Sequence, residues 1–215
     1  HISSVAAIGR RGTGNELDED TEWEDGRWNT NYAHSKMMAE MEVRRSIEEG
    51  LNAVILNPSV IISADDIERS SGQIFKYILE ERRFYPTGYI NYVDMRDVVN
   101  VILRCLKENI SGKRYILNAG RKKYKQFFEE IALRLNKRAP SVRATRFLLT
   151  VGIFLDFLKS SITRARRMIT KETALVGQSN ILFKSDKVTG DLGIMFRKLN
   201  ETLDWACQNI KEKRA

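Results

Sequence analysis

Short apolar runs and longer segments with helical periodicity alternate along the chain. Apolar residues that recur every three to four positions indicate amphipathic helices, and short apolar runs between turn residues indicate strands. Because strands that alternate with helices usually pair in parallel, the pattern predicts an α/β fold with a parallel sheet. Strands are expected at the start of the chain and at 52–62, 89–93 and 114–117, and helices at 30–49, 73–82, 97–108, 124–136, 144–159, 163–176 and 197–212.

The apolar residues also indicate which positions are buried. The nearly continuous apolar run over 52–62 is typical of a parallel strand that is covered on both faces. Residues 9–31 are rich in glycine and acids and are expected to form an irregular loop at the rim of a substrate pocket. The inward positions of the helices at 97–108 and 197–212 are predicted to be Val98, Val101, Ile102, Cys105, Leu199, Leu203, Trp205 and Ile210.

Tyr32 and Lys36 are the most informative polar pair. They lie four residues apart at the start of a predicted helix, so both side chains leave the same face. A phenol loses its proton near pH 10, and a close ammonium favours the phenolate and lowers that pKa. Such a pair can give or take a proton at the hydroxyl or carbonyl carbon of a substrate. Taken alone the spacing is a weak signal, because an ordinary exposed helix turn can contain it.

Further signatures accompany this pair in a particular order. The chain opens with an apolar run that ends in two hydroxyls, and the segments after the Tyr-Lys pair are Asn57-Pro58-Ser59-Val60, Asn91 to Val98 and Phe183 to Lys187. In this order and spacing the sequence resembles the extended short-chain dehydrogenase/reductase family, which includes sugar-nucleotide epimerases, dehydratases and dihydroflavonol-reductase-like enzymes. The resemblance covers nearly the whole chain.

The resemblance implies an NAD- or NADP-dependent oxidoreductase or epimerase that passes hydride between nicotinamide and a carbonyl or hydroxyl carbon. In that family Tyr32 would be the general acid/base, Lys36 would tune the phenol and bind the nicotinamide ribose, and Ser4 would orient the substrate oxygen. Ser4 is preferred over Ser3 because in relatives the active hydroxyl lies five residues before a glycine, here Gly9. The residues expected to contact the cofactor are Tyr32 and Lys36 together with Asn57, Pro58 and Val60, of which the last three would flank the nicotinamide.

Several alternatives stay open within this class. The substrate, a nucleotide-sugar or another small carbonyl compound, and the choice between NAD and NADP are not determined by these residues. Val5 and Ala6 stand where dehydratases of the family place an acidic pair, which argues against dehydration. A non-catalytic protein of the same fold, which senses a dinucleotide or binds anions, is the hypothesis from another class.

The implied fold is the C-terminal portion of a Rossmann-type doubly wound parallel sheet with a smaller, mainly helical substrate-binding lobe. Members of the family begin with a strand, a glycine-rich turn and a helix that holds the pyrophosphate. The glycines of residues 10–14 lie in an acidic loop with no strand before it, so they do not fit that unit. The chain is therefore expected to be the C-terminal two-thirds of an enzyme and to be inactive alone. Residues 1–120, with substrate-lobe segments at about 63–95, would be the remainder of the NAD(P)-binding domain, and 121–215 the basic helical lobe.

Composition narrows the chemistry. Cys105 and Cys207 lie within helical patterns far apart in the sequence, which indicates buried free thiols in a reducing compartment such as the cytoplasm. His1 and His34 are the only imidazoles, which argues against a zinc site or a Ser-His-Asp mechanism, and no metal is expected. Asp94 and Asp97 precede or open a helix, where carboxylates cap free N–H groups.

Charge and hydrophobicity bear on partners. The net charge of +8 divides into −4 over residues 1–120 and +12 over 121–215. Solvated helix faces, a phosphate-bearing substrate or an anionic membrane surface could each explain the basic part, and nucleic acid ranks last because no aromatic-interleaved motif accompanies the charge. The apolar run from Phe147 to Leu158 is too short to cross a bilayer. A homodimer is expected through the Tyr-Lys helix, whose outward residues would be Met38, Met41 and Val43.

Overall fold

The computed structural model describes residues 1–9, 16–26, 29–63, 67–68, 71–145 and 177–213. The chain forms η1 (Val5–Ile8), β1 (Glu16–Leu17), α1 (Asn31–Glu48), β2 (Ile55–Pro58), β3 (Val60–Ile62), α2 (Gly72–Leu79), β4 (Phe84–Tyr85), β5 (Tyr89–Asp94), α3 (Met95–Lys107), β6 (Arg114–Leu117), β7 (Gly120–Lys123), α4 (Tyr124–Leu135), β8 (Val142–Arg143), β9 (Leu182–Phe183), α7 (Asp186–Leu192) and α8 (Leu199–Glu212).

The run predicted as one strand over 52–62 is two strands that pair with different neighbours. β2 pairs in parallel with β6, and β3 pairs in parallel with β5, so the chain changes partner at Ser59. On its other side β2 is bridged in parallel by Ile2, and the Ser3 N–H donates to the Leu56 carbonyl at 2.8 Å. Residues 1–3, β2 and β6 therefore form the parallel sheet expected from the sequence, and β5 extends antiparallel to β7 beyond it.

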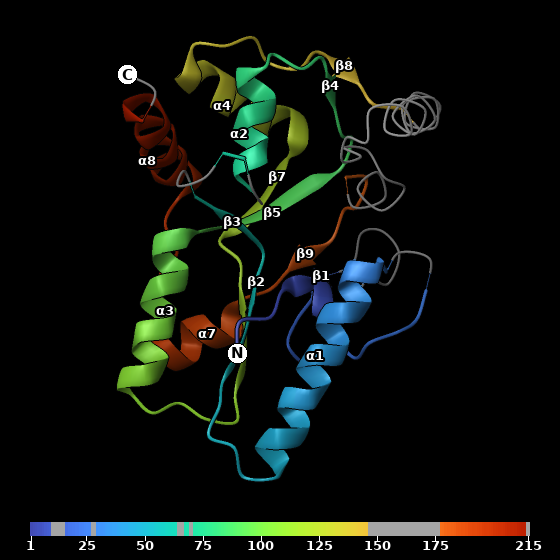
Figure 1. Cartoon of the computed structure of the whole chain (residues 1–215), viewed down its shortest axis with the longest axis vertical. Coiled ribbons are helices and arrows are strands. Elements are labelled where there is room, and N and C mark those ends of the chain that lie inside the picture. Colours follow the sequence, from blue (N-terminus) through green and yellow to red (C-terminus); the bar gives the residue numbers. More distant parts are fainter. Residues whose placement is uncertain (10–15, 27–28, 64–66, 69–70, 146–176, 214–215) are drawn as a thin grey trace.

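The two faces of the β2–β6 sheet carry different layers. Leu56, Tyr115 and Leu117 pack with α3 and α7 in one buried cluster. On the opposite face Ile116 packs with residues of η1, β1 and β9, and α1 lies against η1. Figure 1 shows α3 and α7 on one side of β2 and α1 on the other, which is the layered arrangement of a doubly wound α/β fold.

A further apolar cluster lies around β3 and β5. Phe75 of α2, Phe127 and Ile131 of α4 and Leu203 of α8 are fully buried there. The three helices pack together at the end of the molecule away from α1 and α3 (Figure 1).

Most predicted elements are confirmed to within a few residues. The helices at 30–49, 73–82, 97–108, 124–136 and 197–212 correspond to α1, α2, α3, α4 and α8, and the strand at 114–117 is β6. Val98, Val101 and Cys105 are buried as expected, whereas Ile102 and Trp205 are half-buried. The helices predicted over 144–159 and 163–176 fall almost wholly outside the described residues.

Residues 9–31 are less irregular than predicted in the part that the structure describes. β1 pairs in parallel with β9, so this loop is joined to a segment near the end of the chain. Trp23 packs over Gly9, whose φ of +86° suits glycine and whose Cβ, if present, would lie 3.1 Å from the indole.

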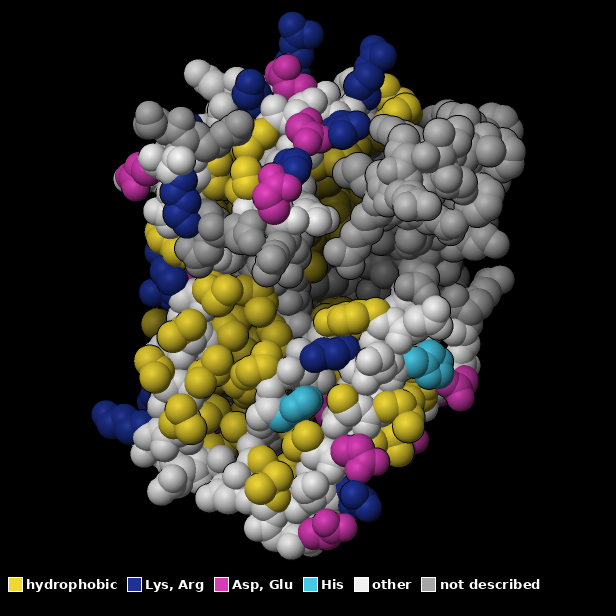
Figure 2. Space-filling model, viewed as in Figure 1, with side chains coloured by type: hydrophobic (Ala, Val, Ile, Leu, Met, Phe, Trp, Pro, Cys, Tyr) yellow, Lys and Arg dark blue, Asp and Glu magenta, His cyan; other side chains and the backbone are white. Residues whose placement is uncertain are grey.

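Hydrophobic side chains are exposed beside the N-terminus. Figure 2 shows them over α3 and the adjoining strand, and they include Ile2, Val99, Leu103 and Leu106. A cavity of about 300 Å³ between His1–Ile2, Val54 and α3 lies under this surface. Among the described helices none is both long enough and apolar enough to span a bilayer.

Two buried aspartates attach β5 and α3 to the C-terminal part of the chain. Asp94 Oδ1 accepts from the Arg96 N–H at 2.8 Å, which caps α3, and its Oδ2 accepts from Thr202 Oγ1 at 2.8 Å. Asp97 pairs with Arg197. Burial alone would raise the pKa of the Asp94 carboxyl, but the hydrogen bonds from Arg96 and Thr202 outweigh it and hold this pKa below its usual value.

Asp94→Asn should lower the free energy of unfolding at pH 7 by about 3 kcal/mol, because it leaves buried donors without their charged acceptor. The Asp94 pKa is lower in the folded chain than the value of about 3.9 of an unfolded chain, so its stabilisation is present above that value and is lost as pH falls through the folded pKa. Urea unfolding should therefore show the difference in stability between the original chain and Asp94→Asn narrowing below about pH 4.

Asp204→Asn, which removes an exposed partner of Arg134, is the control and should change stability by less than about 1 kcal/mol. A difference that is independent of pH would contradict this assignment.

Candidate active site

The position of Tyr32 depends on how α1 begins. Thr30 has extended backbone angles and its Oγ1 accepts from the Ala33 N–H at 3.1 Å, so it is the N-cap of the helix. The helix therefore starts at Asn31, with Tyr32 in its first turn and Lys36 one turn later. Ala33 is buried against the body, which leaves Tyr32 at the edge of the packed face with 57% of its surface exposed.

Lys36 and Ser4 lie at the contact between α1 and the first strand. Lys36 Nζ donates to the Ile2 carbonyl at 3.3 Å. Ser4 is the N-cap of η1, and its Oγ accepts from the Ala6 N–H at 3.2 Å. Within the described residues the Tyr32 hydroxyl has no hydrogen bond. The structure thus brings Lys36 to the strand that carries Ser4, with Tyr32 one turn earlier on the same helix.

The predicted nicotinamide segment ends the neighbouring strand. Ile2 pairs with Leu56, which puts Ser4 and Pro58 at the same carboxyl end of two parallel strands. Pro58 is buried, and Val60 is half-buried at the start of β3. Open α/β sheets bind their ligands at this end of the strands.

Asn57 differs from what the sequence led us to expect. Its side chain is fully buried, and its Nδ2 donates to the Ser4 carbonyl at 2.9 Å and to Glu40 Oε2 at 2.7 Å. Its Oδ1 accepts from Arg114 Nε at 3.2 Å. Because all the polar atoms of this side chain have protein partners, a contact of Asn57 with a cofactor would be left to its backbone, and that contact stays a prediction.

Glu40 is a buried charge that the sequence analysis did not single out. It is 3% exposed and faces the sheet from α1, where it pairs with Arg114 at 2.7 Å. A signal was present in the sequence. Glu40 lies two helical turns after Ala33, so the two side chains leave the same face of α1, and Ala33 is buried. An acid on the packed face of an amphipathic helix has to meet a buried donor, but the sequence does not reveal which one.

Glu19 supports the other side of Arg114. Its Oε1 accepts from the Ile116 N–H at 2.7 Å, and its carbonyl accepts from Arg114 Nη1 at 3.1 Å. Burial raises the pKa of the Glu19 carboxyl above its usual value. Burial also lowers the pKa of the Arg114 guanidinium, an effect that the nearby Glu40 charge opposes.

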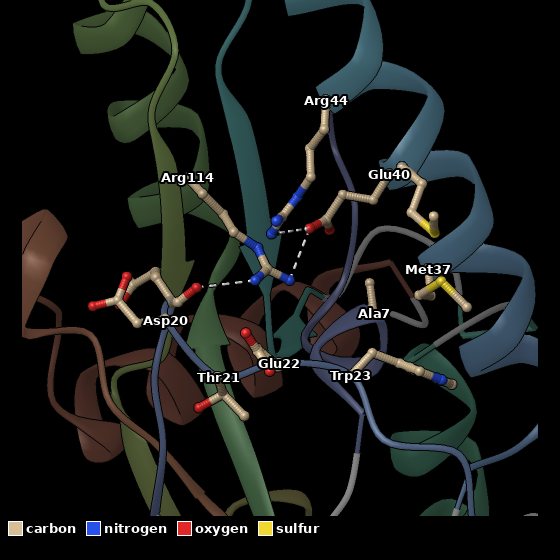
Figure 3. Close-up of a pocket in the computed structure, with 11 residues that line it drawn as sticks. Ala7, Asp20, Thr21, Glu22, Trp23, Met37, Glu40, Arg44 and Arg114 are labelled. Carbon is tan, nitrogen blue, oxygen red and sulfur yellow. Dashed lines mark hydrogen bonds and ion pairs between the residues drawn. The ribbon is translucent and has the colours of Figure 1, made fainter. Parts of the chain in front are cut away.

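A cavity of about 420 Å³ lies between α1 and the loop before it. Figure 3 shows the guanidinium groups of Arg44 and Arg114 converging on Glu40, with Met37 on the same helix and Trp23 on the loop. Ser4, Tyr32, Lys36 and Pro58 do not line it. Ala7 of η1, the short helix that Ser4 caps, does line it.

The two histidines of the chain lie apart from each other in the described structure, and so do its two cysteines. No three His, Cys, Asp or Glu side chains within it lie close enough together to hold an ion. His34 instead contacts the edge of Trp23, with 5.0 Å between ring centroids, and lies 3.6 Å from Asp25. Cys105 and Cys207 are buried free thiols, as predicted.

Comparisons with known proteins were consistent with the resemblance inferred from the sequence. The model of an NAD-binding family described as male sterility protein matches residues 1–106. Sterol demethylase protein B of Methylococcus capsulatus is 31% identical over 54% of this chain and 36% of its own length. A putative dihydroflavonol 4-reductase of Synechocystis is 32% identical over the same shares. The matched region thus spans about a third of these curated relatives.

Solved structures support the fold of the residues that the structure describes. A nucleoside-diphosphate-sugar epimerase from Pseudomonas aeruginosa superposes with a TM-score of 0.80 at 21% identity, covering 99% of this chain and 66% of that structure. The Bordetella bronchiseptica enzyme WbmH, solved in complex with NAD+, has a TM-score of 0.71 at 15% identity, with 100% and 62% covered. These likenesses confirm the predicted α/β fold of Rossmann type.

Removal of the α1 cap should loosen the turn that carries Tyr32. Thr30→Ala is expected to lower the free energy of unfolding by about 1 kcal/mol, because the Ala33 N–H loses its acceptor. Amide hydrogen exchange at residues 32–34 should quicken at the same time. Thr30→Ser keeps the hydroxyl and should behave as the original chain, and equal losses in both variants would argue against the cap.

Proposed function

We propose, for a chain whose sequence and fold resemble the extended short-chain dehydrogenase/reductase family, that the intact enzyme transfers hydride between a nicotinamide dinucleotide and a carbonyl or hydroxyl carbon of a small substrate. The observation that carries this proposal is the meeting of three segments at one end of the sheet. Lys36 of α1 contacts the carbonyl of Ile2, and the carbonyl of Ser4 holds Asn57, which precedes Pro58. Open α/β sheets bind their ligands at such strand ends, and a tyrosine there can move a proton, which supports the proposal.

The residues present fit the nicotinamide end of NAD or NADP. Ser59 is 7% exposed, yet its Oγ has no hydrogen-bond partner within the described residues. A buried hydroxyl without a partner is costly, and a carboxamide group at this place could pair with it. Lys36 would hold the ribose, and Asn57, Pro58 and Val60 would flank the ring. The bound dinucleotide would supply or accept the hydride.

In the proposed mechanism this chain's residues handle the proton and the position of the substrate. Tyr32 would give a proton to the new alkoxide during reduction, or take one during oxidation. Lys36 would hold the nicotinamide ribose one helical turn from Tyr32. Ser4 would donate a hydrogen bond to the same substrate oxygen and so hold the reacting carbon in place.

The substrate class and the direction of the reaction belong to this proposal as well. The relatives named as a dihydroflavonol reductase and a nucleoside-diphosphate-sugar epimerase make a carbonyl reductase and a nucleotide-sugar epimerase the two candidates. We also propose that residues 121–215 belong mainly to a substrate-binding lobe and residues 1–120 mainly to the dinucleotide-binding part. A reducing compartment such as the cytoplasm would keep both buried thiols free.

Within the described ranges, no contact singles out the alternative of a non-catalytic, anion-binding protein. Where the structure describes basic residues of the C-terminal part, many have acidic partners. Lys122 pairs with Glu130 at 2.9 Å and Lys184 pairs with Glu16 at 2.7 Å. These pairs compensate only part of the positive charge, because the net charge over residues 121–215 is +12.

Tyr32→Phe in the intact enzyme should lower kcat by at least about 100-fold, because the reaction loses its proton donor. The KM for the dinucleotide should change little, since the phenol oxygen acts mainly on the substrate. Steady-state turnover with either cofactor would measure this. Tyr115→Phe removes a hydroxyl that bonds Asp191 on the opposite face of the sheet and should leave kcat unchanged. Undiminished turnover of Tyr32→Phe would eliminate the proposed role.

We further propose a homodimer through α1. Met38 and Met41 are 56% and 54% exposed on its outer face, whereas Val43 is half-buried and would contribute less. Replacing both methionines by lysine should shift the intact protein toward monomer in sedimentation at micromolar concentration, because charges in an apolar contact are costly. Met195→Lys, at an exposed methionine outside this helix, should have no effect. A purely monomeric parent protein would refute the proposal.

A further inference from the structure

The carboxylate of Glu40 accepts four hydrogen bonds or ion pairs in a buried position. Oε2 accepts from Ser3 Oγ and from Asn57 Nδ2, each at 2.7 Å. Oε1 pairs with Arg114 at 2.7 Å and with Arg44 at 3.3 Å. Each oxygen therefore has two donors, which is the full capacity of a carboxylate.

These donors come from the segments that hold the predicted catalytic residues. Ser3 precedes Ser4, Asn57 precedes Pro58, and Glu40 lies one turn after Lys36 on α1. Asn57 also holds the Ser4 carbonyl at 2.9 Å with the same nitrogen that donates to Glu40. One carboxylate thus joins the strand end of Ser4, the strand end of Pro58 and the helix of Tyr32.

The arrangement leaves little freedom, because Arg114 contacts two of its members. Its Nη2 pairs with Glu40 and its Nε donates to Asn57 Oδ1 at 3.2 Å, which closes a ring of three side chains. A buried network in which every donor and acceptor is paired resists displacement, since any shift exposes an unpaired polar atom to a low dielectric. Shifts of about 1 Å at reacting groups can cost about 100-fold in rate, so a rigid support of this kind matters for catalysis.

We propose that Glu40 is a positioning residue of the active site. Through Ser3 and Asn57 it holds Ser4 at the distance from Tyr32 and Lys36 that the reaction needs, and this inference rests on the function proposed above. Glu40 itself touches neither substrate nor cofactor, because all four of its acceptor positions are filled by protein groups. Its effect on the reaction passes through Ser4.

A double-mutant cycle of Glu40→Gln and Ser4→Ala in the intact enzyme tests this directly. In Glu40→Gln an NH2 group replaces one carboxylate oxygen. That group cannot accept hydrogen bonds from Ser3, Asn57 or Arg114, so the ring of side chains would open. Glu40→Gln alone should lower kcat by about 10- to 100-fold, with the KM for the dinucleotide changed by less than about threefold. In the Ser4→Ala background the same change should lower kcat by no more than about threefold, because the group that it positions is already absent.

The outcomes separate this inference from the proposed function. Full, multiplicative losses in the double variant would overturn the positioning role, since a merely structural loss does not depend on Ser4. Unchanged kcat in Ser4→Ala alone would overturn the role of Ser4 and with it the proposed function. Glu42→Gln removes an exposed carboxylate that pairs with Arg45 at 3.0 Å on the same helix, and it should leave kcat unchanged.

A milder variant serves if Glu40→Gln does not fold. Ser3→Ala removes one donor and leaves the pair of Glu40 with Arg114 in place. It should lower kcat by about two- to tenfold, the equivalent of one hydrogen bond, and should have almost no effect in the Ser4→Ala background. Equal losses in the presence and absence of the Ser4 hydroxyl would again overturn the proposal.

Discussion

A buried negative charge joins the helix of the candidate site to the sheet. Glu40 is removed from water, which is costly for a carboxylate unless donors replace the lost hydration. Arg114, Asn57, Ser3 and Arg44 supply that replacement, so α1 can dock on β2 and β6 in essentially one way. Lys36 and Tyr32 lie in the first two turns of the same helix, where the Thr30 cap and the contact of Lys36 with the Ile2 carbonyl hold them.

The two faces of the sheet consequently have different tasks. The face toward α3 and α7 is apolar, with Leu56, Tyr115 and Leu117 in a continuous cluster, and hydrophobic burial there is tolerant of small shifts. The face toward α1 contains buried polar groups in addition to apolar ones. The hydrogen bonds of these polar groups depend on direction and distance. Stability thus comes mainly from one face, and the geometry that the reaction needs comes from the other.

Periodicity predicted α3, α4 and α8 because each buries an apolar face. The order Ser4, Tyr32, Lys36 and Pro58 identified the candidate site by resemblance. The partner change at Ser59 could not be predicted, because an apolar run looks the same whichever strand it pairs with. β1 and β9 have two residues each and exist only through their mutual pairing. Glu40 stands in the sequence beside Glu42 and has the same charge, and only the position of Arg114 in space distinguishes the buried acid from the exposed one.

The parallel pairing of β1 with β9 has a consequence for biosynthesis. Leu17 of β1 and Phe183 of β9 are register partners. During synthesis β1 leaves the ribosome long before β9, so the two strands can pair only late. Until β9 has been synthesised, β1 in the loop that leads to Tyr32 has no strand to pair with. The candidate site is therefore incomplete in the nascent chain. Closure of such distant contacts is slow and entropically demanding. A premature stop before residue 182 would therefore leave β1 without its partner, although the two strands are far apart in the sequence.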